Sequence, residues 1–512
     1  MRRFNLKNEG LYMLFSSMIF LWVFLPIVLG GNFLFSILPF KAERNRIRAK
    51  NIFLLIASLI FYAWGGIYYL LIMLSSILLN FAGGYVLEKG VKSKRARRAA
   101  FIVIVALNIA ILFFFKYFNM LIAIIESLMQ SGAGFREVWQ TMLSMKGTGT
   151  LNLAQIVLPI GISFFTFQAM SYVMDVYMGT AKLQENIIDF ALYVSLFPQL
   201  IAGPIVKYSD VDLQLQSRKE TLDLFVSGQK RFLYGLGKKV LVSNVLAKVA
   251  DDIWALEIEN LGAAVAWLGI IAYTLQIYFD FSGYSDMAIG LGRMMGFEFK
   301  ENFDYPYTAL SIQEFWRRWH ISLSSWFKEY IYIPLGGNRK GKFRTYINLF
   351  IVFMLTGIWH GANFTFIFWG LFHGVLQIIE RLFLGKWLKK NPVKIFNWIY
   401  TIFAVMIGWI YFRSDNIFQA NEYVRQLFNF TSGNYSIVRF LSMNVIVVVI
   451  FGILFSGFAQ RLLKSSYDKL CARAGSSRVI FVADSVVQFA ILALSMAALV
   501  GGTYNAFIYF QF

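Results

Sequence analysis

The chain has 512 residues, of which 58% are hydrophobic, 18% aromatic and only 15% charged, and its mean hydropathy is +0.59. Soluble domains carry about 25% charged residues, so this composition excludes a soluble globular protein and predicts an integral membrane protein. The net charge of +20 could suggest a nucleic-acid partner, but the basic residues are confined to short loops. That distribution is typical of membrane topology, and we expect no nucleic acid.

Apolar runs long enough to cross a bilayer recur along the whole chain, among them residues 11–38, 99–125, 441–458 and 479–500. A helical span needs about 20 residues, so we predict an all-α polytopic protein with about 10 to 12 transmembrane helices. The first run is too long for a signal-peptide core and is expected to be retained. No stretch of soluble composition separates the runs, so residues 1–512 are predicted to form a single domain.

Basic clusters predict the topology. They occupy residues 41–50, 89–98, 339–344 and 386–394, with a weaker cluster at 461–478. The apolar segment between the first two clusters is broken at Gly65-Gly66, which predicts a two-helix hairpin that returns both clusters to one side. The positive-inside rule makes that side cytoplasmic and places the nearly neutral segments 130–151 and 414–436 outside. Both termini of this multi-pass plasma- or inner-membrane protein are then expected to be extracytoplasmic.

Histidine is scarce and clustered. The chain has three histidines, His320, His360 and His373, within a window of 54 residues. Histidine titrates closest to neutral pH and is the natural proton acceptor in catalysis, so this clustering inside apolar sequence points to chemistry. The single cysteine, Cys471, excludes an intrachain disulfide and a CxxC motif,. No spaced pattern of zinc ligands is present, and we expect no metal.

His360 is predicted to lie deep in the membrane. It follows Arg344 by sixteen residues, a rise of roughly 24 Å at ~1.5 Å per helical residue, within a hydrocarbon core of about 30 Å. A second apolar segment, 364–384, returns to the next basic cluster, so His360 is expected near the top of a hairpin. A polar side chain at that depth is a candidate functional residue; the alternative is a buried histidine bonded to a neighbouring helix. For His373, helix packing is the simpler interpretation.

The segment 311–335 is predicted to form a re-entrant or interfacial helix. Its apolar residues form one helical stripe, while its charged residues interrupt any simple span,. Within it, His320 follows Trp319, and Arg317 and Ser324 lie three and four residues away, close enough on a helix surface to orient or tune the histidine,. The alternative is an amphipathic helix that anchors at the headgroups and carries an incidental histidine.

Two carboxylates, Asp280 and Asp286, lie in an apolar context. They could bind a polar substrate, but ion pairing is the commoner explanation for a carboxylate in such a place. The candidate partners are Arg293, Arg317 and Arg318. Upstream, the run 197–204 contains two prolines and a glycine, which indicates either a helix interrupted around a cavity or a simple kink.

Six motifs follow one another within residues 155–385. They are Leu158-Pro-Ile-Gly-Ile-Ser-Phe-Phe-Thr-Phe-Gln, Phe197-Pro-Gln-Leu-Ile-Ala-Gly-Pro, Asp280-Phe-Ser-Gly-Tyr-Ser-Asp, Phe315-Trp-Arg-Arg-Trp-His-Ile-Ser-Leu-Ser, Tyr332-Ile-Pro-Leu-Gly-Gly and Gly357-Ile-Trp-His-Gly-Ala. In this series the chain resembles the membrane-bound O-acyltransferase family, specifically its bacterial branch that acylates cell-envelope polymers. The motifs look more like the alginate-acetylating type than the type that transfers D-alanine to teichoic acid.

The resemblance implies a multi-helical fold that encloses a tunnel or funnel, with a catalytic histidine at its neck. It identifies that residue as His360 and carries a second signature position onto His320. Six further residues are candidates for binding or orienting the substrate: Trp319, Arg317, Ser324, Trp359, Asp280 and Asp286.

The expected reaction moves an acyl group from a cytoplasmic thioester to a hydroxyl of an extracellular envelope polysaccharide or partner protein. We expect this acyl group to be acetyl. The donor is expected to be acetyl-CoA or a phosphopantetheine carrier, with no tightly bound cofactor. His360 would accept the hydroxyl proton, while His320 would orient the reactants or stabilise the oxyanion. The implied partners are the lipid bilayer and a secreted or membrane-anchored serine-type (SGNH) acyltransferase.

The sequence also leaves other functions open. One is D-alanyl transfer to teichoic acid, and another is a transporter or flippase of envelope precursors that uses the histidines as a proton relay. A third is a scaffold for an export complex. A transporter is expected to show an internal repeat, and the histidine motifs are not paired between the two halves of the chain.

Overall fold

The computed structural model describes residues 13–131, 140, 143, 158–431, 433–471, 476–502, 504, 505 and 508. Within these ranges the regular secondary structure is helical and contains no strand, which confirms the all-α prediction. Residues 1–12, most of the expected outward loop 130–151, and most of the residues after 505 lie outside the described part.

The N-terminal region contains the predicted hairpin. Helix α3 (Glu43–Ala63) and helix α4 (Ile67–Tyr85) are joined at Gly66, whose φ of 142° is a conformation that glycine adopts without strain,. Helix α2 (Leu25–Ile37) precedes them and the long helix α5 (Lys94–Ser131) follows. Four helices complete this half: α7 (Ile162–Met178), α8 (Ile187–Ser195), α9 (Phe197–Leu200) and α10 (Tyr208–Gln216).

The proline-containing run 197–204 forms the short helix α9 followed by a non-helical, buried segment. The run is therefore a true interruption between α8 and α10. The backbone N–H of Ile205, just beyond it, donates to Ser322 Oγ at 3.0 Å. The interruption thus reaches the segment that carries His320.

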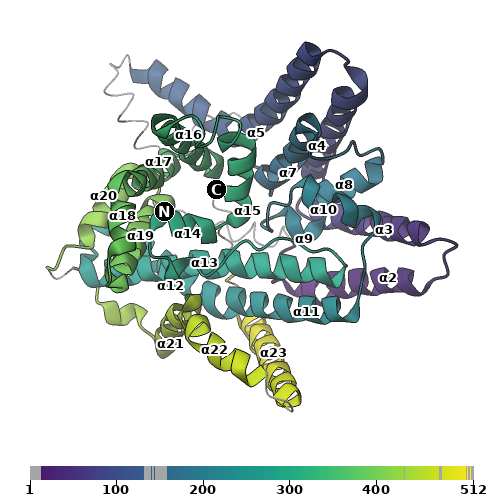
Figure 1. Cartoon of the computed structure of the whole chain (residues 1–512). Helices are drawn as coiled ribbons and strands as arrows, with labels where there is room; N and C mark the ends of the chain where they lie inside the picture. Colours follow the sequence, from purple (N-terminus) through teal and green to yellow (C-terminus); the bar gives the residue numbers. More distant parts are fainter. Residues whose placement is uncertain are drawn as a thin grey trace.

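A central pair of helices crosses the molecule between its two halves (Figure 1). Helix α13 (Gly262–Met294) is buried over most of its length and packs along α11 (Leu222–Gly237), while α12 (Asn244–Trp254) lies against it as well. A Cβ on Gly235 would lie 2.6 Å from the carbonyl oxygen of Gly283. The glycines therefore bring the two backbones into direct contact, as small residues do between membrane helices.

The second half carries the histidines. It contains α14 (Ile312–Arg318), α15 (Ile321–Phe327), α16 (Lys342–His360), α17 (Phe364–Ile379), α18 (Gly385–Lys390), α19 (Lys394–Arg413) and α20 (Ile417–Gln426). Helices α16 and α17 form the expected hairpin, with His360 as the last residue of its first helix. Three more helices close the chain: α21 (Met443–Ile453), α22 (Ala459–Cys471) and α23 (Ser476–Gly501).

Eight helical segments in the described part are long and apolar enough to cross a membrane: Phe20–Ile37, Ile67–Gly90, Lys94–Ile122, Gly262–Met294, Phe364–Lys390, Lys394–Arg413, Met443–Leu463 and Val479–Gly501. We expected about 10 to 12. Helices α3 and α16, of 21 and 19 residues, have a sufficient length but carry charged residues, most of them basic, at their N-terminal ends,. The protein is a multi-pass membrane protein, and the side on which its termini lie stays a prediction.

The buried core consists of two hydrophobic clusters. The first contains N-terminal helices together with Trp326 and Trp359, and the second surrounds α13, α17 and α19 and contains Trp319, Trp369 and Trp409. Rings from both clusters meet at the histidines. The fold thus places the candidate site at the seam between two separately packed halves.

Candidate active site

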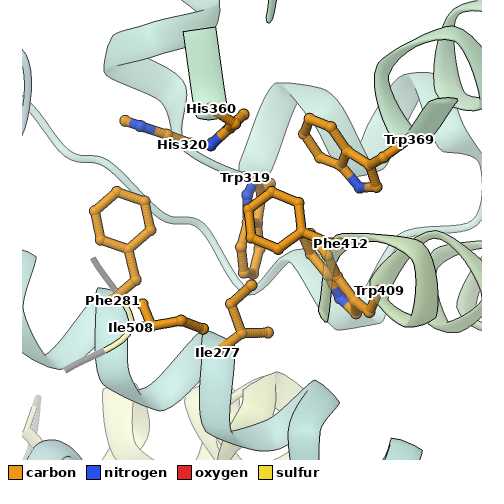
Figure 2. A pocket seen from close by; sticks show the side chains of 9 residues that line it. All are labelled: Ile277, Phe281, Trp319, His320, His360, Trp369, Trp409, Phe412 and Ile508. Carbon is orange, nitrogen blue, oxygen red and sulfur yellow. The ribbon is translucent and has the colours of Figure 1, made fainter. Parts of the chain in front are cut away.

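His320 and His360 line one cavity. Its walls are formed by nine residues: Ile277, Phe281, Trp319, His320, His360, Trp369, Trp409, Phe412 and Ile508. Figure 2 shows the two imidazoles at one end in this view, with aromatic rings around the rest. The space open to the centre of a water-sized sphere is about 20 Å³, enough for about one water molecule. Among the nine residues, the histidines are the only titratable ones.

His320 lies at a break between two helices. Its φ of 44° is left-handed, an uncommon conformation for a residue with a side chain, and it separates α14 from α15. The backbone groups that lose their helical partners at this break bond to residues 302–304. Ile321 N–H donates to Asn302 O at 2.9 Å, and Asp304 N–H donates to Arg318 O at 2.9 Å. The continuous helix expected over 311–335 is therefore wrong.

Asn302 fixes the imidazole of His320. Its amide nitrogen donates to Ser285 Oγ at 3.0 Å, so its oxygen faces the histidine, 3.1 Å from Nδ1. The same oxygen accepts from the N–H and the hydroxyl of Ser322 at 3.2 and 2.9 Å. An acceptor opposite Nδ1 places the proton on that nitrogen. The other nitrogen, Nε2, has no partner among the described residues, and its lone pair is available to a reactant.

His360 is held by aromatic rings. Its ring makes edge-to-face contacts with Trp359 and Trp369 at 4.9 Å and with Phe412 at 5.0 Å between centroids. Gly361, which follows, packs so closely that a Cβ there would lie 2.4 Å from the ring of Phe366. The Trp-His-Gly motif thus combines a ring contact, the candidate histidine and a close contact at the turn between α16 and α17.

Two of the predicted substrate-orienting residues lie at the cavity. Trp319 lines it, and the ring of Trp359 contacts the rings of both histidines, at 6.2 Å from His320 and 4.9 Å from His360. A substrate-binding role for either tryptophan stays a prediction.

Arg317 and Ser324 do not share a helical face with His320. The left-handed residue between them ends one helix and begins the next, so the spacing of three and four residues no longer brings their side chains together. Arg317 is exposed and Ser324 is partly buried, and neither lines the cavity. The expectation based on a single helix was wrong because the hydrophobic stripe continues across the break.

Asp280 and Asp286 form ion pairs, as the commoner interpretation predicted, but with other partners. Asp280 is fully buried and pairs with Lys239 at 2.5 Å, while its second oxygen accepts from the N–H of Ile508 at 2.8 Å. Asp286 pairs with Arg231 and Lys238 at 2.8 and 2.6 Å. These partners lie on α11 and on the π-helical segment Lys238–Ser243 that continues it, both of which pack against α13. Asp280 thus connects the cavity-lining residue Ile508 to the core.

His373 is completely buried but does not line the cavity. Its ring packs against Trp316 at 5.3 Å and Trp369 at 5.4 Å, and a Cβ on Gly408 would lie 2.6 Å from its Nε2. This packing agrees with the interpretation of His373 as a helix-packing residue. In the described ranges no three histidine, cysteine, aspartate or glutamate side chains gather in one place, and the expectation of no metal stays a prediction.

The model of the family described as MBOAT, membrane-bound O-acyltransferase, matches residues 184–419. Along its length the chain is 41% identical to a probable alginate O-acetylase AlgI of Pseudomonas putida, covering 98% of this chain and 100% of that protein. The chain belongs to the membrane-bound O-acyltransferase family. It is a membrane O-acyltransferase. Eight of the nine residues that line the histidine cavity, from Ile277 to Phe412, lie inside the matched region.

Two other relatives of this O-acyltransferase have names that specify other polymers, peptidoglycan and teichoic acid. A peptidoglycan O-acetyltransferase of Helicobacter pylori is 35% identical over 79% of this chain and 78% of its own length. A teichoic acid D-alanyltransferase of Bacillus subtilis is 30% identical over 48% of this chain and 65% of its own length. The likeness to the O-acetyltransferases therefore extends over much more of the chain.

Several residues that line the histidine cavity or contact its histidines escaped sequence reasoning. Phe281 lies inside a quoted motif, but Asn302 is separated from His320 by 18 residues and has no local signal. Trp369, Trp409 and Phe412 come from helices that only the tertiary fold brings to the cavity. Their aromatic character alone could not distinguish them from the many other aromatic residues of the chain.

Proposed function

We propose that this acyltransferase moves an acetyl group from a cytoplasmic thioester to a hydroxyl group outside the membrane, with His360 and His320 as its catalytic residues. The observation that carries the proposal is the convergence of these histidines, 40 residues apart in sequence, on one aromatic-walled cavity. The family to which the chain belongs supplies the class of reaction.

In the proposed reaction, His360 accepts the proton of the acceptor hydroxyl as its oxygen attacks the thioester carbonyl. The carbon–sulfur bond then breaks, the new ester forms, and the proton passes to the departing thiolate. Direct transfer of this kind needs no cysteine intermediate, and the single cysteine, Cys471, lies in another part of the chain.

For His320, the bond to Asn302 favours an orienting role over oxyanion stabilisation. A neutral imidazole whose proton is on Nδ1 can only accept at Nε2, whereas an oxyanion requires a donor. The Nε2 lone pair is suited to accept a hydrogen bond from a reactant or from protonated His360. The indole N–H of Trp369, which lines the cavity and has no partner among the described residues, is available as a donor to the oxyanion.

The acyl group is assigned from relatives. Proteins named as O-acetylases or O-acetyltransferases match up to 98% of the chain, while those named as D-alanyltransferases match about half of it. This difference supports acetyl over D-alanyl. The acceptor is then a hydroxyl of an envelope polysaccharide, or of a secreted serine-type acyltransferase that passes the acetyl group on, and acetyl-CoA or a phosphopantetheine carrier supplies the thioester.

The proposal is tested with membranes that contain the wild-type protein or single variants, supplied with radiolabelled acetyl-CoA. We expect His360→Ala to lose transfer of label to envelope polymer by at least about 10³-fold, since it removes the base, and His320→Ala to lose about 10²-fold. His373→Phe is the matched control, because it replaces a buried histidine that packs against the same Trp369 without lining the cavity. It should retain transfer.

The possible results distinguish the proposed function from its alternatives. Full transfer by folded, membrane-inserted His360→Ala would refute the catalytic assignment. Label that enters polymer from a D-alanyl carrier but not from acetyl-CoA would replace acetyl with D-alanyl. Export of polymer that fails in the histidine variants, while acetylation of supplied polymer continues, would instead support a transporter.

A further inference from the structure

Helix α16 ends at His360, and its last carbonyl groups need hydrogen-bond partners outside the helix. The final four C=O groups of an α-helix have no N–H partner within it. In α16 these include the carbonyls of Ile358 and Trp359, directly before the histidine. Trp359 and His360 are both buried, so an unsatisfied carbonyl there would be costly.

Two consecutive residues of α5 supply these partners. The ammonium group of Lys116 donates to the carbonyl of Trp359, and the hydroxyl of Tyr117 donates to the carbonyl of Ile358. Lys116 also donates to Ser163 Oγ at 3.3 Å and lies 5.6 Å over the Trp359 ring. Three helices, α5, α7 and α16, are thus joined at the residue that precedes His360.

The charge of Lys116 suits this position. A helix carries a partial negative charge at its C-terminal end, where a cation is stabilising. Among the described residues no carboxylate forms an ion pair with Lys116, so the end of α16 is the negative group that it meets. A lysine in a membrane helix can also extend simply to reach the headgroups, an alternative that predicts no effect on the reaction.

The motif that begins at Leu158 takes part in the same contact. Phe164 and Phe167 of this motif each pack against the Trp359 ring at 5.6 Å between centroids. Helix α7 therefore holds the side chain of Trp359 while α5 holds its carbonyl. Both restrain the residue whose ring contacts the rings of both histidines.

We propose that Lys116 and Tyr117 clamp the end of α16 and so position His360 for acyl transfer, with Lys116 as the principal positioning residue. The inference rests on the proposed function, because it requires His360 to be catalytic. It gives a role to a lysine within a membrane-spanning helix, and to the first of the six motifs.

The test measures initial rates of label transfer from radiolabelled acetyl-CoA in membranes, normalised to folded protein. We expect Lys116→Met to lower kcat about 10²-fold, the cost of a displacement of roughly 1 Å in a reacting group, with KM for acetyl-CoA within about two-fold. Lys116→Arg, which keeps a charged donor, should recover part of the loss, and Tyr117→Phe should lower kcat about three- to ten-fold. Lys50→Met is the control, since it removes another buried, hydrogen-bonded lysine that contacts Ser36 and Glu220; it should lower stability but leave kcat unchanged.

Wild-type kcat in Lys116→Met or in Tyr117→Phe would overturn the proposal, as would a loss that only follows the amount of folded protein. If Lys116→Met does not fold, Tyr117→Phe decides, because it removes only the hydroxyl that donates to the same end of α16. His360→Ala is measured beside them. An active His360→Ala would refute the proposed function, whereas an inactive one beside fully active clamp variants would refute the clamp alone.

Discussion

Replacing Asn302 by leucine should reveal how much the orientation of His320 contributes to the reaction. Leucine has a similar size and shape but offers no acceptor. The substitution removes the bonds from His320 Nδ1 and from the N–H and hydroxyl of Ser322, at 3.1, 3.2 and 2.9 Å. The hydroxyl can rotate to another acceptor, but the two N–H groups are fixed and buried.

Each buried donor left without an acceptor costs about 1–3 kcal/mol, so two of them predict a loss of stability of about 2–6 kcal/mol. The free imidazole could also place its proton on Nε2, and the lone pair would then no longer face the cavity. We expect kcat per folded molecule to fall about 10- to 100-fold, the range found when the hydrogen-bond partner that orients a metal-ligating histidine is removed.

The assay combines thermal unfolding in detergent with transfer of label from radiolabelled acetyl-CoA. Asn80→Leu is the matched control, because Asn80 is equally buried and exchanges two bonds of 2.9 Å with Asn108, away from the cavity. It should lose stability without losing kcat. The reasoning is refuted if Asn302→Leu transfers label at the wild-type rate, or if both variants lose activity only in proportion to unfolding.

Two further substitutions test the packing around the site. In Gly361→Ala the new Cβ would lie 2.4 Å from the ring of Phe366, so we expect about 1–3 kcal/mol of destabilisation and reduced transfer; an unchanged Tm would show that Phe366 moves freely. In Asp280→Asn the fully buried Lys239 loses the carboxylate that pairs with its charge, which should cost about 3–5 kcal/mol, and the double variant Asp280→Leu with Lys239→Met should recover much of the Tm. Equal Tm values for the single and double variants would contradict this account.

Hydropathy and loop charge predicted the parts of the fold that depend on local sequence. The hairpin that turns at Gly66 and the hairpin after His360 were both predicted from runs of apolar residues between basic clusters. These succeeded because a membrane helix must satisfy its own backbone hydrogen bonds, which leaves few alternatives for a long apolar run. The same logic placed His360 at the end of a helix.

The prediction of one helix over residues 311–335 failed because the backbone conformation of a single residue ends the helix that the pattern of apolar side chains indicates. Apolar residues keep a helical period through the segment around His320, yet its left-handed φ ends α14 and starts α15. What favours this conformation is a distant segment, since the backbone of Asn302 bonds to Ile321. Periodicity within a single segment carries no information about such a partner.

The apolar walls of the cavity bear directly on the choice between transfer and hydrolysis. Water is itself a hydroxyl nucleophile, so a histidine that activates an alcohol would also activate a water molecule beside a thioester. Seven of the nine lining residues are aliphatic or aromatic, and the space holds about one water,. An acceptor hydroxyl that enters must displace that water, and the side chains left around the reacting atoms offer little to hold another. Under the proposed function, the dense packing of tryptophan and phenylalanine around the two histidines thus favours acyl transfer over loss of the donor to water.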